Sequence, residues 1–578
     1  MRLARIFKEK CNPERCSNYC QKLCPINRKG EQCIKITNKA SINEELCIGC
    51  GICHKCPFEA ISIINLPESL KQQPIHQYEK NGFRLYDLPL PQKNKVVGII
   101  GKNGIGKTTA IEILTGLLKP NLNSNASEEE VLNFFKGKEI QNHFKNLKKL
   151  KISYKPQKID QIPKVTKGTV RSLLKKTDEK NQLEKVAKEL EIDNILNNKI
   201  ENLSGGELQR VAIAATVLKK ASIYIFDEPT NYLDIKQRFK IAKFIRSLLN
   251  EKTSVLVIEH DLIILDYLSD VIHLMYGQEA CYGIVSQPKT TKIGINTYLE
   301  GYLKQENVRF RDKKIKFEEK SAIKSLKFEN LTSYSEISKK LGNFTLTTEE
   351  GDIKKKQILG ILGPNAIGKT TLMKILSGNL KPDSGKLEKI KISYKPQYIK
   401  TDSNDLVITQ LQQSKKFNNS KYQSLVIEPL RLEPLFNKKI KNLSGGELQK
   451  VAIALALLRE ADLILLDEPS AFLDIEERLL LSKTLKNFIE QEEVSALIVD
   501  HDLLFIDYIS DELMIFSGIP SISGHCSSPL LMEEGMNSFL KTSKITLRRD
   551  TENLRPRINK PNSVLDKKQT SSSKYYYQ

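Results

Sequence analysis

The chain reads Gly101-Lys102-Asn103-Gly104-Ile105-Gly106-Lys107-Thr108-Thr109 between two apolar stretches, 95–100 and 108–115. The first stretch predicts a buried strand and the second predicts a helix, so the glycine-rich segment opens a helix. Backbone N–H groups at such a helix start bind a polyphosphate, since the helix dipole favours anions. We expect Lys107 to reach the β- and γ-phosphates and Thr108 to bind Mg²⁺. The segment predicts an α/β domain with a phosphate-binding loop.

The same pattern returns as Gly363-Pro364-Asn365-Ala366-Ile367-Gly368-Lys369-Thr370-Thr371. Ala366 stands where the first copy has Gly104, and its methyl group is expected to crowd the second loop. Four further motifs recur in the same order. The first pair ends at Gln157 and at Gln397, and the other three pairs are 202–209 and 442–449, 226–234 and 466–474, and 258–261 and 499–502. Such ordered self-similarity predicts two copies of one domain.

Each copy contains an apolar run that ends in Asp-Glu, namely 223–228 and 463–468. Fully apolar runs are typical of buried parallel strands. We expect Asp227 and Asp467 to hold the Mg²⁺ shell, and Glu228 and Glu468 to polarise an attacking water. A solvated strand end is the alternative, but two copies at matched positions favour the catalytic interpretation.

The first copy is longer than the second. Gln157 and Gln397 are 240 positions apart, whereas Lys107 and Lys369 are 262 apart. The first copy therefore carries an insertion, at 121–147, in which Ser127-Glu128-Glu129-Glu130 predicts a helix start and Gly137 a break before a second helix. A tolerated surface insertion and a partner-docking element are both consistent with it.

Leu203-Ser204-Gly205-Gly206-Glu207 and Leu443-Ser444-Gly445-Gly446-Glu447 resemble the signature of the ATP-binding-cassette superfamily. The resemblance implies two cassettes that face each other head to tail, so that the signature of one completes the ATP site of the other. Ser-Gly-Gly at a helix start is itself suited to anions. Site one is expected to combine Lys107, Gln157, Asp227, Glu228 and His260 with Ser444, Gly445 and Gly446. Site two is expected to combine Lys369, Gln397, Asp467, Glu468 and His501 with Ser204, Gly205 and Gly206.

The other residues expected to bind ATP lie in the loops and nearby aromatic positions. In the loops they are Gly101, Asn103, Gly104, Gly106, Thr108 and Thr109, and Gly363, Asn365, Gly368, Thr370 and Thr371. Tyr78 or Phe83, and Tyr334, are candidates to stack on adenine, although such aromatic residues also pack in cores.

Lys and Arg number 91 against 69 Asp and Glu, which gives a net charge of +22. This excess indicates a polyanionic partner or a Lys-rich composition throughout the chain. The sequence shows no apolar run of about 18–20 residues and no signal-peptide core, so we expect a cytoplasmic protein that does not enter a membrane.

Nine of the eleven cysteines lie within 11–56. Cys11-x₄-Cys16-x₃-Cys20-x₃-Cys24-Pro25 and Cys47-x₂-Cys50-x₂-Cys53-x₂-Cys56-Pro57 are similar to the runs that bind [4Fe–4S] clusters in bacterial ferredoxins. Crossed ligation would join Cys24 to Cys47, Cys50 and Cys53, and Cys56 to Cys11, Cys16 and Cys20. The gap between Cys53 and Cys56 is one residue shorter than usual. Three outcomes are consistent with it: the helix end unwinds and Cys56 still binds, Cys33 replaces Cys56, or the second cluster is lost. Zinc is an alternative for either run.

The order of cysteine runs, cassette, hinge and cassette resembles the E-subfamily of cassette proteins, the RNase L inhibitors or ribosome-recycling ATPases. The resemblance covers the whole chain and includes 46–53, 160–164, 259–270, 306–311 and 555–560. It implies a ferredoxin-like cluster domain (1–75), a first cassette (76–290), a hinge (291–320), a second cassette (321–540) and a basic tail (541–578).

The E-subfamily resemblance also implies an ATPase that splits ribosomes with a class-1 release factor or its rescue paralogue, with initiation factors as further partners. Arg309, Arg311 and the basic tail suit contacts to ribosomal RNA phosphate on the small subunit. The rival functions are those of a transporter ATPase subunit, of a redox ATPase, and of an ATPase in another nucleic-acid process. A transporter would need a permease, and a redox ATPase would need titratable clusters.

Overall fold

The computed structural model describes residues 2–8, 10–44, 46–65, 73–79, 81–315, 317, 329–386, 388–397 and 403–577. Part of the expected end of the hinge (318–320) and the expected start of the second cassette (321–328) lie outside these residues. Within the described part of the chain, no helix is both long and apolar enough to cross a membrane.

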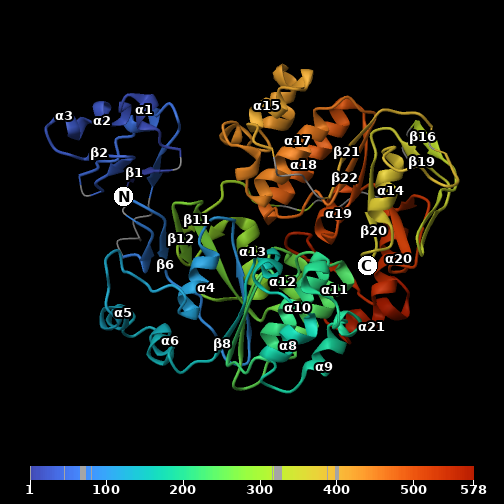
Figure 1. The fold of residues 1–578 in the computed structure, drawn as a ribbon, viewed down its shortest axis with the longest axis horizontal. Helices are drawn as coiled ribbons and strands as arrows, with labels where there is room; N and C mark the ends of the chain where they lie inside the picture. The colour runs from blue at the N-terminus through green and yellow to red at the C-terminus, as the bar shows by residue number, and fades with distance from the viewer. Residues whose placement is uncertain are drawn as a thin grey trace.

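The cysteine domain is built from small elements around buried cysteines. Antiparallel β1 (Arg2–Ile6) and β4 (Ile61–Asn65) form one ribbon, and β2 (Ile34–Ile36) and β3 (Ala40–Ile42) form another. The short helices between them are α1 (Pro13–Cys16), α2 (Tyr19–Leu23), α3 (Pro25–Arg28) and the 3₁₀ turn η1 (Ile52–Lys55). The domain lies beside the first cassette, at the upper left of Figure 1.

The first cassette has a nine-stranded sheet with a parallel centre. Its order is β5 (His76–Gln77), β6 (Arg84–Tyr86), β12 (Tyr282–Val285), β11 (Val271–Gln278), β7 (Val96–Ile100), β10 (Ser254–Ile258), β9 (Ile223–Asp227) and β8 (Ile152–Lys155), with β13 (Lys289–Thr290) beside β11. Every residue of β7, β9 and β10 is buried, as expected of parallel strands covered on both faces.

Helices cover this sheet. The main ones are α4 (Lys107–Thr115), α8 (Val170–Thr177), α9 (Leu183–Glu189), α10 (Gly205–Leu218), α11 (Ile235–Arg246), α12 (Leu262–Leu268) and α13 (Thr291–Glu300), with the short α7 (Ile162–Val165). The predicted insertion forms α5 (Glu128–Phe134) and α6 (Ile140–Asn146), with the capping box at Ser127 and Gly137 between the helices at φ 79°. The ring of Phe135 stacks on Phe144 with centroids 4.9 Å apart, which joins the two helices.

The second cassette repeats the sheet. Its order is β17 (Ser338–Leu341), β18 (Phe344–Thr348), β25 (Ser523–Cys526), β24 (Glu512–Ile519), β20 (Ile358–Leu362), β23 (Ser495–Val499), β22 (Leu463–Asp467) and β21 (Ile392–Lys395), with β26 (Leu530–Leu531) beside β24. A ribbon of β16 (Asn330–Tyr334) and β19 (Gly351–Lys354) stands apart. The helices are α14 (Lys369–Leu376), α15 (Val407–Leu411), α16 (Ser420–Tyr422), α17 (Gly445–Leu457), α18 (Ile475–Glu492), α19 (Leu503–Ile509) and α20 (Met532–Ser543).

Elements of the hinge and tail join the two cassettes, since Arg311 pairs with Glu476 and Arg557 pairs with Asp266. They are β14 (Tyr302–Leu303), β15 (Val308–Arg309), β27 (Leu547–Arg549), β28 (Pro556–Ile558) and α21 (Val564–Ser571). Together with the two sheets and the cysteine domain, they confirm the predicted fold class of tandem α/β cassettes behind a small cysteine-rich domain.

Some basic residues expected to face RNA point inward instead. Arg311 pairs with Glu476 of α18 and donates to the carbonyl of Tyr298 at 2.6 Å. Arg555 is fully buried, and Arg557 binds Asp266 at 2.7 Å. These guanidinium groups join the hinge to the cassettes, so the prediction that Arg311 contacts RNA phosphate is wrong because that side chain already has a carboxylate partner.

Candidate active sites at the interface of the two cassettes

The first phosphate-binding loop lies between β7 and α4. Lys107 is buried, and its ammonium donates to the carbonyls of Gly101 at 2.9 Å and Lys102 at 2.7 Å. Burial lowers the pKa of Lys107, while nearby carboxylates led by Glu228 oppose that shift. Gly106 precedes the helix at φ 87°, a conformation in which glycine is favoured. The loop is shaped to surround an anion.

The second loop keeps the same form despite its alanine. Ala366 adopts φ 59°, in the left-handed region, at a position where Gly104 has φ 70°. Its carbonyl accepts from Ser521 N–H at 2.8 Å, just as Gly104 accepts from Ala280 at 2.9 Å. A left-handed alanine costs roughly 1–2 kcal/mol, so the substitution strains the loop without changing its path. Burial lowers the pKa of Lys369 to about 8.

An oxygen-rich position lies at the start of each loop helix. Thr108 Oγ1 donates to Asp227 Oδ2 at 3.4 Å, and Thr370 Oγ1 donates to Asp467 Oδ2 at 2.8 Å. Burial raises the pKa of Asp227 to about 7 and that of Asp467 to about 6. A buried carboxylate whose negative charge lacks compensation, next to a hydroxyl, fits a hard divalent cation such as Mg²⁺.

Glu228 lies at the end of β9 with its carboxylate held from several sides. Gln157 Nε2 donates to Oε1 at 2.7 Å, Asn231 Nδ2 donates to Oε2 at 2.5 Å, and His260 Nε2 lies 3.4 Å from Oε1. Burial alone would raise the pKa of Glu228, but His260, Lys107 and Gln157 hold it at about 2. The carboxylate is therefore an ionised acceptor at neutral pH.

Glu468 has a similar environment with one difference. Gln397 Nε2 donates to it at 2.7 Å, His501 Nε2 lies 3.5 Å away, and its pKa is also held at about 2. The residue that corresponds to Asn231 is Ala471, which has no side-chain donor. The two sites are thus chemically unequal at the carboxylate that would act on water.

The cassettes face each other head to tail. The Asn103 N–H, in the first loop, donates to Asp474 Oδ2 at 3.1 Å, and the Asn365 N–H donates to Asp234 Oδ2 at 3.0 Å. The signature serines Ser204 and Ser444 accept from N–H groups of their own helices, α10 and α17. Asp234 and Asp474 were missed as site residues, although they end a motif that recurs in both copies.

Two buried histidines at the candidate sites have ring nitrogens that are available for further hydrogen bonds. His260 and His501 are buried, and within the described residues their ring nitrogens make no hydrogen bond beyond the approach to Glu228 and Glu468. Buried polar atoms without partners carry an energetic penalty, so they indicate a position that a ligand completes. A terminal phosphate beside Lys107 or Lys369 would supply that acceptor.

The aromatic residues differ from the prediction in the second cassette. Phe83 lies over the first loop, since a Cβ added at Gly106 would meet its ring Cζ at 2.5 Å, and Tyr78 places its hydroxyl 3.4 Å from Thr109 Oγ1. Phe344 occupies the same position over Gly368 at 3.0 Å. Tyr334 is instead 4% exposed and packs against Gly351, so the choice of Tyr334 for adenine stacking is wrong because no face of its ring is free.

The cysteines gather into two groups. Cys20 is buried with Cys56, Cys11 and Cys16 as neighbours, and its pKa rises to about 11 by burial and by those thiols. Cys53 is buried beside Cys47, Cys50 and Cys24, and its pKa rises to about 12 for the same reasons. The two groups have the same members as the two crossed ligand sets that the sequence predicts.

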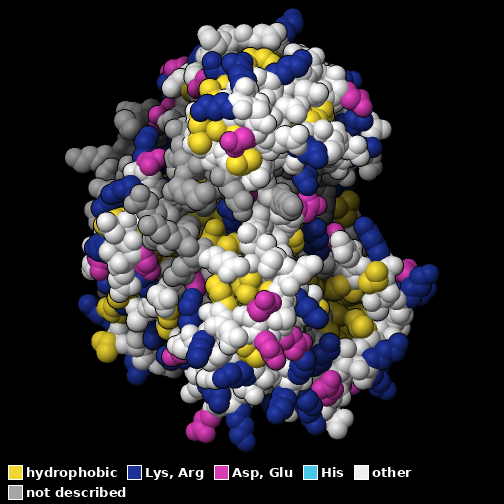
Figure 2. Space-filling model, turned by 90° about the vertical axis from the view of Figure 1, so that its left-hand side faces the viewer, with side chains coloured by type: hydrophobic (Ala, Val, Ile, Leu, Met, Phe, Trp, Pro, Cys, Tyr) yellow, Lys and Arg dark blue, Asp and Glu magenta, His cyan; other side chains and the backbone are white. Residues whose placement is uncertain are grey.

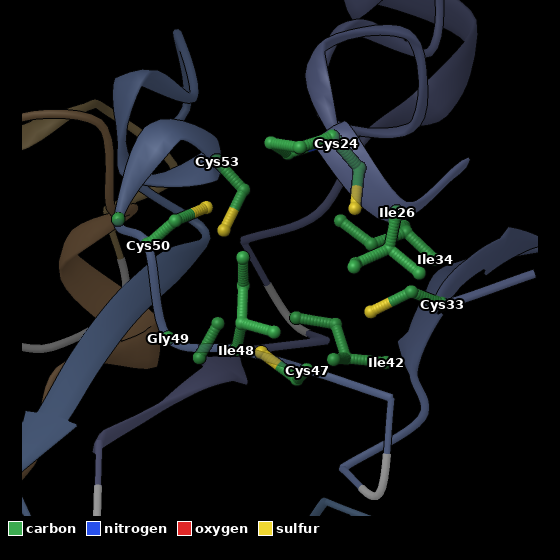
Figure 3. Close-up of a pocket in the computed structure, with 13 residues that line it drawn as sticks. Cys24, Ile26, Cys33, Ile34, Ile42, Cys47, Ile48, Gly49, Cys50 and Cys53 are labelled. Carbon is green, nitrogen blue, oxygen red and sulfur yellow. The ribbon is translucent and has the colours of Figure 1, made fainter. Parts of the chain in front are cut away.

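Cys33 joins the second of these groups. Burial, then Cys24 and Cys47, raise its pKa to about 12. Figure 3 shows the sulfur atoms of Cys24, Cys33, Cys47, Cys50 and Cys53 around one pocket, which isoleucines also line. Cys33 therefore lies away from the group in which it was considered as a replacement for Cys56.

The turn before Cys56 is a 3₁₀ turn and not an α-helical one. Cys53 lies in the 3₁₀ turn η1, and Cys56 follows it in an extended conformation, with φ −65° and ψ 126°. A 3₁₀ turn rises about 2.0 Å per residue against about 1.5 Å in an α-helix, so it lengthens the reach of the chain. Among the described residues, no three Cys, His, Asp or Glu side chains are close enough to share a single metal ion.

The chain is similar in sequence to a known family and to several known proteins. A family model described as ABC transporter matches residues 90–231 and 346–471. The chain is 43% identical to translation initiation factor RLI1 of Saccharomyces cerevisiae and 42% identical to ABC transporter E family member 1 of Arabidopsis thaliana. Each match spans 100% of this chain and 98% of the relative.

Two solved structures are similar over most or all of the chain. One describes ribosome-bound archaeal Pelota and ABCE1, with a TM-score of 0.95 and 50% identity over 100% of this chain and 99% of that one. The other is a complex of archaeal ribosomal stalk protein aP1 with the archaeal ribosome recycling factor aABCE1, with a TM-score of 0.83 and 49% identity over 88% of this chain and 99% of that one.

Proposed function

The chain is an ATPase that belongs to the E family of ATP-binding-cassette proteins, and from that membership we propose that it splits ribosomes into subunits. The observation that carries the proposal is the match of the complete chain, cysteine domain included, to a ribosome-bound ABCE1 with a TM-score of 0.95. We also propose the division of the chain that the sequence resemblance implies, into 1–75, 76–290, 291–320, 321–540 and 541–578.

Each ATP site is proposed to work through residues of both cassettes. Lys107 and the loop N–H groups would bind the phosphates, and Mg²⁺ held by Thr108 and Asp227 would neutralise their charge. Glu228, ionised and oriented by Gln157, would accept the proton of the attacking water. Lys369, Thr370, Asp467, Glu468 and Gln397 would play the same parts in site two.

Closure of the cassettes is the proposed coupling step. ATP would draw the signature of each cassette, Ser204–Gly206 or Ser444–Gly446, onto the nucleotide of the other, because a helix N-terminus attracts phosphate. The contacts of Asn103 with Asp474 and of Asn365 with Asp234 already align the two cassettes for that movement. His260 and His501 would bind the terminal phosphate, and hydrolysis would reopen the interface.

Two [4Fe–4S] clusters are proposed in the cysteine domain. The fit is supported by the two groups of neighbouring thiols, each of which includes buried members, and by the pocket that five cysteines line. Cys11, Cys16, Cys20 and Cys56 would hold one cluster, and Cys24, Cys47, Cys50 and Cys53 the other. When bound, the clusters would cross-link the short elements of the domain, which has few other core residues.

The cysteine domain is attached to the first cassette beside its ATP site. Arg5 Nη1 donates to the Cys281 carbonyl at 2.7 Å, and Asn81 bonds to the backbone of both Ala4 and Ile6. The turn that holds Cys281 also contacts the phosphate-binding loop, since Ala280 N–H donates to Gly104 O at 2.9 Å. From this connection we propose that the nucleotide state of the first cassette moves the cysteine domain.

The proposed partners are the small ribosomal subunit with its RNA, a class-1 release factor or its rescue paralogue, and initiation factors, in the cytoplasm. Lys and Arg side chains are spread over the face shown in Figure 2. Arg309 is exposed and stacks on Tyr302, so its guanidinium edge is open to a phosphate.

Sucrose-gradient sedimentation of purified ribosomes with this protein, a release factor and ATP tests the function. We expect subunits in place of whole ribosomes when ATP is present. Glu228→Gln with Glu468→Gln should still bind ATP and support a single round, without repeated turnover. Intact ribosomes under all conditions would refute ribosome splitting, and full ATP turnover by the double variant would refute the role of the glutamates.

A further inference from the structure

A buried lysine lies behind each catalytic glutamate. Lys155 ends β8, Lys395 ends β21, and each side chain is only 1% exposed. Both lysines lie two positions before the glutamine of their site and on the strand next to the one that ends in Asp-Glu. A lysine that remains charged in an interior needs strong compensation, since burial of an ammonium is unfavourable.

The ammonium groups contact backbone instead of carboxylates. Lys155 Nζ donates to the Asp227 carbonyl at 2.8 Å and to the Glu228 carbonyl at 3.2 Å. Lys395 Nζ donates to the Asp467 carbonyl at 2.8 Å and to the Glu468 carbonyl at 3.3 Å. Each lysine thus binds the two peptide units that flank one glutamate.

A second donor completes the arrangement. Gln209 Nε2, on the signature helix α10, donates to the Glu228 carbonyl at 2.8 Å, and Gln449 Nε2 on α17 donates to the Glu468 carbonyl at 2.5 Å. The backbone of each glutamate is therefore held from the neighbouring strand and from the signature helix of its own cassette.

The glutamates need such support because of their backbone. Glu228 and Glu468 both have φ 49°, a left-handed conformation that side-chain-bearing residues rarely adopt. Each is followed by a proline, Pro229 or Pro469, which restricts the preceding residue further. Strain of this kind persists only where surrounding contacts impose it, and it occurs at functional sites.

We propose that Lys155 and Lys395 are positioning residues for ATP hydrolysis. Each ammonium fixes the strained peptide units around Glu228 or Glu468, and thereby aims the carboxylate at the attacking water without touching ATP itself. The inference rests on the proposed role of the two glutamates as general bases. The same contacts occur in both cassettes, although the environments differ elsewhere, for example at Asn231 and Ala471.

A simple structural role is the alternative, and it makes a different prediction. A methionine fills nearly the volume of a lysine, and it removes the cost of burying an ammonium, which offsets the loss of two hydrogen bonds to backbone carbonyls. A space-filling lysine would therefore tolerate Lys→Met in catalysis as well as in folding. A positioning lysine would lose turnover while the fold stays intact.

The test compares Lys155→Met with Lys395→Met in the full chain, singly and together. For the double variant we expect kcat for ATP hydrolysis to fall about 10- to 100-fold, the range for a misplaced catalytic group, with KM and ATP affinity changed less than about threefold. The thermal unfolding temperature should remain near that of the parent. Lys155→Arg keeps the cation and should retain more turnover than Lys155→Met.

Lys180→Met is the matched control. Lys180 is a partly buried lysine of the same cassette whose ammonium donates to the Val217 carbonyl at 2.7 Å and to Tyr224. Its contacts lie outside the site, so this variant should hydrolyse ATP normally. Equal losses of turnover in Lys180→Met and Lys155→Met would contradict a specific role for Lys155.

Combination with glutamate variants separates the two hypotheses. If the lysines act through the glutamates, Lys155→Met and Lys395→Met should add no further loss to Glu228→Gln with Glu468→Gln. Unchanged kcat in the lysine variants, with hydrolysis still abolished by Glu→Gln, overturns the lysine inference alone. Normal hydrolysis in the Glu→Gln variant overturns the general-base assignment itself.

Discussion

The backbone N–H of Asn103 lies 3.1 Å from Asp474 Oδ2, and this hydrogen bond joins the first phosphate-binding loop to the second cassette. Asn365 makes the equivalent bond to Asp234 at 3.0 Å. Each phosphate-binding loop is thus hydrogen-bonded to the opposite cassette, at the aspartate that ends the repeated motif 226–234 or 466–474.

Loss of the hydrogen bond between Asn103 and Asp474 should lower the rate of ATP hydrolysis more than it lowers the stability of the fold. Asp474 also caps α18, accepting from Glu477 N–H at 2.9 Å. Asp474→Ser keeps a capping oxygen but is too short to reach Asn103. We expect ATPase kcat to fall roughly 10- to 150-fold, because a hydrogen bond to a charged group contributes about 1.5–3 kcal/mol. Asp178→Ser, at another helix start with Oδ1 accepting from Gln182 N–H, is the control and should leave turnover unchanged.

Iron content should distinguish the cysteines. Anaerobically purified protein is expected to hold about eight irons per chain if both groups bind a [4Fe–4S] cluster. Cys56→Ser should lower the content towards four, because Cys56 lies with Cys20. Cys33→Ser should retain both clusters, since Cys33 lies beside Cys24 and Cys47 in a group that has four other thiols. Four irons in the parent protein would exclude the second cluster.

The insertion should loosen at acidic pH. His143 of α6 is buried and bonds through Nε2 to the Leu114 carbonyl of α4 at 2.9 Å. Burial lowers the pKa of His143 below its usual value, so the imidazole is neutral in the folded protein at neutral pH. Below about pH 6.5 the His143 imidazole gains a proton in the unfolded segment more readily than in the folded one. The free energy of unfolding therefore decreases as the pH falls.

Hydrogen exchange of α5 and α6 measures this effect. Amides of the insertion should exchange faster at pH 5.5 than at pH 7.5, after correction for intrinsic rates. His143→Gln keeps an N–H donor without a titrating group and should remove most of the pH dependence. The same response in parent and variant would show that another group controls the insertion.

Adenine stacking should depend on Phe344 in the second cassette. Phe344→Ala, measured with Lys107→Ala to disable site one, should weaken ATP binding about 5- to 150-fold, since base–aromatic stacking contributes about 1–3 kcal/mol. Tyr334→Phe serves as the control, because Tyr334 packs in the core and should leave affinity unchanged. A large effect of Tyr334→Phe with none from Phe344→Ala would reverse the assignment.

Ribosome binding should depend strongly on salt. With several phosphate contacts, affinity is expected to fall roughly 10³- to 10⁵-fold between about 50 and 200 mM salt. Arg309→Ala should reduce the slope, whereas Arg557, paired with Asp266, should act through hinge stability. An affinity for ribosomes that does not change with salt concentration would indicate a docking surface made of protein contacts.

Local sequence determined the elements and the motifs. Strands such as β7 and β9, the helix starts at Ser127 and Ser204, and the two loops around Lys107 and Lys369 all depend on hydrophobic pattern, capping and glycine conformation within a few residues. Repetition of each motif in one order also predicted two cassettes, because chance does not reproduce five motifs in register.

Tertiary structure decided which side chains meet and which remain open. The contact of Asp474 with Asn103 and the pairing of Arg311 with Glu476 join residues far apart in the chain. The position of Cys33 beside Cys24 and Cys47 depends on how the short elements of the cysteine domain pack. The burial of Tyr334 depends on packing against Gly351. Such contacts are set by how whole elements pack, and no pattern within a few residues specifies that packing.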